Sequence, residues 1–288
     1  MGCWLVPHRP PLEILLLCMR ILSHYGGEFR SVHTQRTPNP HELTTGTRQA
    51  RHNLHWTYLS QLKMTAPSPC ATLLRSLCRS NTALLHQKVG LIDALTTRHG
   101  NAAAATEAFT KPCPIVGATI GQHFRHSMDH MELAALVAFA RCNEALNEEG
   151  GNYAQADPAD IHYDLRVRGG TLEKDMEEAR KRIVSVVHVL DEISNAVSSP
   201  DASQGQGEDL AKHIVHSPVH AQFYLTADEG EESKLPSTVG RELGFVAHHA
   251  IHHMAMVKVI ALQSAGLSEE DLPDAFGRAP STIKYDRS

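Results

Sequence analysis

Histidine is concentrated in two short stretches of this 288-residue chain that lie far apart in the sequence. Residues 123–130 and 248–253 hold seven of the 20 histidines, where an even spread would put about one. Each stretch sits in a segment that is long enough for a helix and rich in apolar residues. This clustering constrains the fold. If the histidines of both stretches form one site, the two segments that contain them must pack against each other.

The first stretch predicts a helix over about 117–147 that turns its histidines inward. At about 100° per residue, His123, His126 and His130 fall within one arc of roughly 60°. The arc is otherwise apolar, since it also holds Leu133, Ala134 and Val137.

Charged residues of the same segment fall on a different side. Arg125, Asp129 and Glu132 share a separate arc, and Arg125 and Asp129 have the (i, i+4) spacing of an ion pair. We expect this side to form a solvated edge of the helix.

The second stretch lies in a helix predicted from about Thr238 to Ala265, with Gly266 as its C-cap. This segment is apolar nearly all round. His249 and His253 share their arc with Val246, Met256, Val257 and Ile260, so this pair is also expected to point into the protein.

Two further helices are predicted from the period of the apolar residues, at about 80–98 and 171–197. Residues 157–170 are expected to form a loop. The region 198–236 contains Pro200, glycines and SPVHAQFYLTAD, which indicate a crossover with a short β-strand or hairpin. The predicted fold class is all-α: an up-down four-helix bundle with a long crossover, formed by residues 80–288.

Residues 1–79 have the composition of a disordered or targeting segment. The first 80 residues contain three acidic side chains against nine Lys or Arg, with many Ser, Thr and Pro. From Met64 the chain resembles an organellar transit peptide in composition, and a disordered tail fits equally well. The apolar run 12–22 is too short to span a bilayer and contains Arg20. Met1 and Met64 both remain open as translation starts.

Charge and cysteine content limit the partners and the compartment. A net charge of -5 and a pI near 6.5 provide no basic surface for nucleic acid or an anionic membrane. The six cysteines show no CxxC spacing, which argues against a disulfide framework and favours a reducing compartment. We expect an intracellular protein, either cytoplasmic or organellar with a mitochondrial or plastid transit peptide.

The inward histidines favour a metal site. An HxxxH pair on a helix puts His249 and His253 one turn apart, where both can reach one ion at about 2.0–2.1 Å. A third histidine from the 117–147 helix would complete the set and leave positions open, as catalytic metals require. Imidazole suits Zn, Fe, Ni or Cu, and the sequence does not choose among them. Glu-x-x-His motifs are absent from the sequence, which argues against a carboxylate-bridged di-iron bundle.

The alternative is that these histidines only pack. A single buried histidine is more often a hydrogen-bonded core residue than a ligand. Several buried together without a metal would leave donors and acceptors to be satisfied at roughly 1–3 kcal/mol each, so the cluster favours metal binding. The angles of His123, His248 and His252 place them at the edge of the inward faces or off them, where we expect supporting contacts or simple packing.

Four strings in this order resemble the DinB/YfiT-like superfamily, in particular its DinB-like domain proteins: IGQHFRHSMDHMELA at 120–134, HYDLR at 162–166, GRELGFVAHHAIHHMAMVKVIA at 240–261 and FGRAPSTIKY at 276–285. The likeness covers about 80–288. It implies a four-helix bundle in which His126, His249 and His253 hold one divalent metal ion. His130 stands where relatives often carry a carboxylate, which makes it a fourth ligand or a catalytic proton carrier.

The resemblance also implies a chemistry, because superfamily members include thiol-dependent S-transferases and isomerases. We therefore expect a metal-dependent thiol S-transferase that uses Zn, Ni or Fe. Its substrate would be a small molecule, such as a low-molecular-weight thiol, and the chain could form a homodimer through helix faces. The alternative is a non-catalytic metal-binding bundle that serves as a sensor, a store or an interaction module.

Overall fold

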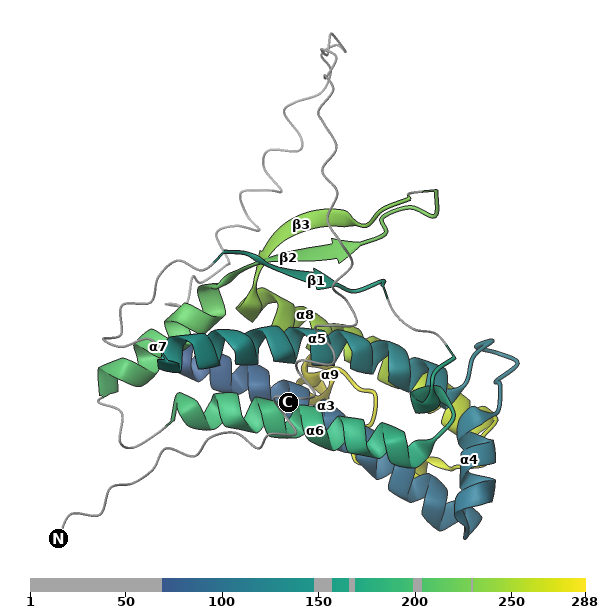
Figure 1. The fold of residues 1–288 in the computed structure, drawn as a ribbon. Helices are drawn as coiled ribbons and strands as arrows, with labels where there is room; N and C mark the ends of the chain where they lie inside the picture. The colour runs from purple at the N-terminus through teal and green to yellow at the C-terminus, as the bar shows by residue number, and fades with distance from the viewer. Residues whose placement is uncertain (1–68, 148–156, 166–168, 199–203, 229) are drawn as a thin grey trace, which may run out of the picture. The chain divides into compact units, whose positions relative to one another are not determined.

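The computed structural model describes residues 69–147, 157–165, 169–198, 204–228 and 230–288. This part of the chain is mainly helical and carries a small three-stranded sheet (Figure 1). A disordered or targeting segment was predicted at 1–79, and residues 1–68 of it lie outside the described residues. This role therefore stays a prediction.

Four long helices form the body of the fold: α3 (Cys70–His99), α5 (Ile120–Asn147), α6 (Met176–Ala196) and α8 (Val239–Gln263). Helix α5 packs against α8 and α6, and α3 packs against the same two helices. Each helix turns a stripe of apolar residues toward its neighbours, as the 3.6-residue period predicts. The core lies between them and includes Leu85, Leu91, Phe124, Ile183 and Val257.

Two helix starts differ from the prediction. Helix α3 begins at Cys70 rather than near residue 80, because Leu74 and Cys78 continue its buried stripe toward the N-terminus. Helix α6 begins at Met176 rather than near residue 171, since Asp175 is its N-cap. The Asp175 carboxylate accepts hydrogen bonds from two backbone N–H groups of the first turn.

The fold is mainly helical, as predicted, and its sheet has one strand more than the predicted hairpin. Strands β2 (Pro218–Phe223) and β3 (Ser233–Thr238) form an antiparallel hairpin between α6 and α8, in the region where a strand or hairpin was predicted. Strand β1 (Ala159–His162) lies in the segment predicted as a loop and pairs in parallel with β2. The sheet rests on the helices through contacts of β1 with α5 and of β2 and β3 with α8.

Shorter helices fill the connections. Helix α4 (Ala102–Thr110) follows α3, α7 (Gln204–His216) precedes the hairpin, and α9 (Pro280–Asp286) lies near the C-terminus. Two 3-10 turns, η1 (Thr171–Glu173) and η2 (Glu269–Asp271), precede α6 and follow α8. The crossover was expected to contain only a strand or hairpin, so α7 is a correction.

The helical state of α7 depends on tertiary packing rather than on local propensity. Its Leu210, Ala211 and Ile214 are buried, and the helix packs against α3, α5 and α8. One of the glycines that suggested a loop, Gly207, is instead needed for close packing. A Cβ at Gly207 would lie 2.8 Å from the carbonyl oxygen of Val197, so this close approach requires glycine.

Helix α8 is long and apolar enough to cross a membrane, judged by length and composition alone. It contacts α3, α5 and α7 as well as strands β2 and β3. Packing within the domain therefore accounts for its apolar composition.

Candidate metal centre

The two histidine stretches lie on α5 and α8, which pack against each other. His126 and His130 are one turn apart on α5, and His249 and His253 are one turn apart on α8, so each pair shares a face. The ring centroid of His126 is 5.0 Å from that of His249 and 4.4 Å from that of His253. The structure therefore brings together all four residues that the sequence singled out.

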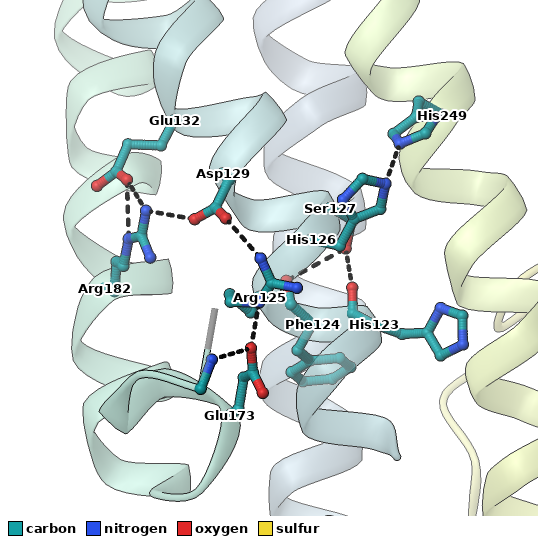
Figure 2. A network of polar contacts seen from close by, with 11 residues as sticks. His123, Phe124, Arg125, His126, Ser127, Asp129, Glu132, Glu173, Arg182 and His249 are labelled. Carbon is teal, nitrogen blue, oxygen red and sulfur yellow. Dashed lines mark hydrogen bonds and ion pairs between the residues drawn. The ribbon is translucent and has the colours of Figure 1, made fainter. Parts of the chain in front are cut away.

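The Nε2 atom of His249 has two close nitrogen neighbours. It lies 3.1 Å from Nε2 of His126 and 3.1 Å from Nε2 of His253; Figure 2 shows the first of these contacts. A ring nitrogen carries either one N–H or one lone pair in the ring plane, so it can form a linear hydrogen bond with only one of the two neighbours.

A shared ion would explain both spacings. Nitrogens bound to one ion at about 2.0–2.1 Å lie about 2.8–3.4 Å apart when the angles at the ion are about 90–110°. The two contacts of 3.1 Å fall within that range. Each of these two nitrogen pairs is therefore spaced as two ligands of one transition-metal ion would be.

His130 lies beside this group and is only 3% exposed. Its ring stacks on that of His249 at 4.3 Å between centroids and on that of Tyr163 at 4.7 Å. One ring nitrogen each from His126, His130 and His249 lie within 4.8 Å of one another. In this position His130 can serve as a fourth ligand or as a proton acceptor next to the other three rings.

His123 lies at the edge of the group. Its Nδ1 is 2.8 Å from Nδ1 of His253, so His253 turns one ring nitrogen to His249 and the other to His123. A contact of this kind holds the orientation and tautomer of a ligating histidine. The other two histidines of α8, His248 and His252, are exposed.

Burial favours the neutral form of two of these imidazoles, those of His253 and His123. The pKa of His253 is lowered from 6.5 to about 2, chiefly because burial penalises the imidazolium and further because His126 and His249 repel its charge. Burial, followed by the charge of Lys88, also lowers the pKa of His123. Because metals bind the neutral imidazole, His253 is ready for a cation at neutral pH.

The sheet contributes an aromatic wall. Tyr163 follows β1, and its backbone N–H donates to the carbonyl oxygen of Gln222 on β2. The Tyr163 ring stacks on Phe223 at 4.9 Å between centroids, and Phe245 of α8 lies 5.7 Å from both rings. These contacts place Tyr163 against His130.

A buried carboxylate holds Tyr163 in place. The Tyr163 hydroxyl donates to Oε2 of Glu242 at 2.8 Å, and Oε1 of Glu242 accepts from Ser237 at 2.5 Å and Arg241 at 2.7 Å. Burial, and then the Glu242 charge, raise the pKa of Tyr163 well above its usual value. The sequence analysis assigned no role to this pair. The available signal was Glu242, a carboxylate that lies seven and eleven residues before His249 and His253 on the same inward face.

The other side of α5 corrects the expectation of a solvated edge. Arg125, Asp129 and Glu132 are 8%, 7% and 5% exposed. Figure 2 shows the reason: Arg125 pairs with Glu173 of η1 at 2.5 Å, and Arg182 of α6 pairs with both Asp129 and Glu132. These ion pairs tie α5 to its neighbours and so set the rotation at which its histidines face α8.

A buried lysine is linked by hydrogen bonds to the turn of α5 that carries the first histidines. Lys88 of α3 is fully buried, and its Nζ donates to Oγ of Ser127 at 2.6 Å. The Ser127 hydroxyl in turn donates to the carbonyl oxygen of His123 at 2.8 Å. This chain of hydrogen bonds links α3 to the turn of α5 that carries His123 and His126.

Comparison with known proteins identifies no family. A scan against protein-family models finds no match, and neither does a search of solved structures. A curated relative, "FK506-binding protein 5" of Rhizopus delemar, is 30% identical over 125 residues. The match covers 43% of this chain and 27% of that protein, so the chain spans about a quarter of the length of the relative.

Proposed function

We propose that this chain is a DinB-like protein in which α3, α5, α6 and α8 form an up-down four-helix bundle. The pairwise packing of α5 with α8 and α6, and of α3 with the same two helices, supports this arrangement. Such bundles build metal sites from side chains that face inward on neighbouring helices. The histidines of α5 and α8 occupy that kind of position.

The proposed ligands of a single divalent ion, Zn, Ni or Fe, are His126, His249 and His253. The observation that carries this proposal is the pair of 3.1 Å contacts at Nε2 of His249, only one of which can be a linear hydrogen bond. The contact of His123 with His253 adds the outer hydrogen bond that ligating histidines usually have.

The proposed activity is thiol S-transfer to a small electrophile. When bound, the ion would stabilise the thiolate of a low-molecular-weight thiol. His130 would accept the thiol proton, and its stacking on His249 and Tyr163 holds its ring in one orientation. The hydrogen bond from Tyr163 to Glu242 fixes that aromatic wall. The name of the Rhizopus protein refers to FK506, but the short match gives no reason to extend that binding to this chain.

A non-catalytic metal-binding bundle is the second candidate. It is favoured by the closeness of His130, whose ring nitrogen lies within 4.8 Å of those of His126 and His249. If four imidazoles bind a tetrahedral zinc ion, no position remains open for a thiol. The site would then serve as a sensor, a store or an interaction module.

Metal analysis of the purified full chain tests the binding claim. We expect about one tightly held ion per chain. The double variant His249→Ala/His253→Ala should lose it, whereas His86→Ala/His188→Ala, which removes two exposed histidines from other helices, should keep it. An ion retained at full occupancy by the first variant would show that the ligands are assigned wrongly.

The variant His130→Gln separates the two functions. If His130 carries protons, the variant keeps its ion but loses turnover in a screen of small thiols and electrophiles. If His130 is a ligand, the variant loses metal affinity by about 10–100-fold or more. Absorption spectra of the cobalt-substituted protein provide a further readout, because an open site should change its spectrum when a thiol is added and a closed site should not.

A further inference from the structure

Helix α8 carries a second HxxxH pair, His248 and His252, displaced by one residue from the inner pair. Since each residue advances the helix by about 100°, the second pair lies on the neighbouring face. Both of its side chains are exposed, whereas His253 is buried and His249 is half-buried. The same helix therefore presents one histidine pair to the interior and one to solvent.

The outer pair has the geometry of a chelate. His248 and His252 lie in the middle of α8, which continues for two turns or more on either side, so the backbone between them is fixed. Imidazoles one turn apart on a helix can bind a single ion. Ala255 and Val259, further along the same side, are uncharged and do not compete for the rings.

Both rings are also available for ligation. Within the part of the chain that the structure describes, neither His248 nor His252 forms an ion pair or a side-chain hydrogen bond. His188 of α6 provides a contrast, because its Nε2 lies 3.1 Å from a carboxylate oxygen of Glu192.

The outer pair adjoins the inner group. The ring centroids of His252 and His253 are 5.3 Å apart, with the planes at 75°. A cation on the outer pair would thus lie one imidazole away from the inner histidines.

We propose that His248 and His252 form a second metal site, which takes up a hydrated divalent transition-metal ion from solution and passes it across the His252–His253 contact to the inner histidines. The uptake step stands on the exposed pair alone, and the transfer step rests on the proposed inner centre. Two imidazoles leave most coordination positions to water, so the outer site binds more weakly than the inner one. Among the divalent ions of the first transition row, Cu²⁺ should bind to the outer site most tightly.

Calorimetric titration of the chelator-stripped full chain with Zn²⁺ tests the uptake step. The wild type should bind one ion tightly and one weakly. His248→Ala/His252→Ala should lose the weak ion and keep the tight one, whereas His249→Ala/His253→Ala should do the reverse. The control His86→Ala/His188→Ala should keep both. Alanine favours helix at the exposed positions 248 and 252, so the outer variant should fold normally, and circular dichroism will verify this.

Either of two outcomes would overturn the uptake step: a wild type that binds no weak ion, or an outer variant that still binds it. A wild type that binds only the weak ion would refute the inner centre and leave the outer site standing. For the transfer step, stopped-flow mixing with limiting Zn²⁺ measures how fast the tight site fills. Filling should be slower in the outer variant than in the wild type and the control, and equal rates would refute transfer.

Discussion

Replacing Lys88 by methionine should stabilise the protein at neutral pH, and this gain should disappear at high pH. Lys88 is fully buried, and its Nζ lies 2.6 Å from Oγ of Ser127 and 4.4 Å from the ring centroid of Phe124. Because burial removes water from the ammonium group, the pKa of Lys88 is lowered from 10.5 to about 7. This difference of about 3.5 in pKa corresponds to roughly 5 kcal/mol.

The sign of the stability change follows from the state, folded or unfolded, in which Lys88 binds its proton more tightly. The folded-state pKa lies below the unfolded-state value, so protonation of Lys88 favours unfolding. The cost is largest at pH 7 and below, and it fades as the pH rises toward 10.5. Methionine avoids this cost but gives up a hydrogen bond and a cation–π contact, each worth about 1 kcal/mol. The variant should therefore be more stable by roughly 2 kcal/mol at pH 7 and have no advantage at pH 10.

Urea unfolding followed by circular dichroism measures this effect. The chelator-treated full chain and the variant are compared at several pH values between 7 and 10, so that the titration of all other groups cancels in the difference. Lys284→Met, at an exposed position of α9, is the matched control and should leave the free energy of unfolding nearly unchanged throughout. If the difference for Lys88→Met stays constant over this range, the reasoning is refuted.

Three further substitutions test the frame around the histidines by urea unfolding. Gly121→Ala would put a Cβ 2.1 Å from the carbonyl oxygen of Glu173 and should cost about 1–3 kcal/mol or more, whereas Gly170→Ala meets open space and should be tolerated. Arg125→Met leaves Glu173 buried without its partner and should cost about 3–5 kcal/mol; a loss below about 1 kcal/mol would mean that water replaces the arginine. Tyr163→Phe removes the donor to a buried carboxylate and should cost about 1–3 kcal/mol, and an unchanged midpoint would contradict that role.

Helical periodicity predicted the part of the site that lies within single helices. His249 and His253 share an apolar arc on α8, and His126 and His130 share one on α5, so their inward direction follows from the angle per residue alone. The structure adds which nitrogens meet. The contact of His123 with His253 joins two helices and depends on their relative rotation, which no local pattern contains.

The elements that were missed depend on distant partners. Strand β1 is four residues long and is stabilised by parallel pairing with β2, about 60 positions later in the chain. Helix α7 contains glycines and is held by its packing against α3, α5 and α8. In both cases tertiary contacts override the weak local preference for a strand or a helix. A prediction from short stretches of sequence therefore assigns loops to these segments.

The charged arc of α5 shows why burial could not be read from the helix itself. An (i, i+4) pair such as Arg125 and Asp129 occurs on solvated faces and on buried ones alike. The outcome here depends on Glu173 of η1 and Arg182 of α6, which supply the opposite charges from other elements. A pattern within one helix cannot reveal such partners.

Helix α5 thus buries polar groups on two sides, and the two sides differ in how their burial is compensated. On the side of Arg125, full charges are desolvated, and only oppositely charged partners at close range offset that cost. On the histidine side, burial lowers the pKa of His253 and so holds its ring neutral, which costs far less and keeps a ring nitrogen able to bind a cation. A cation bound by these histidines would stabilise the folded chain by mass action, without being required for folding. Removal of the metal should therefore lower the unfolding temperature modestly, whereas breaking the ion pairs of α5 should threaten the fold itself.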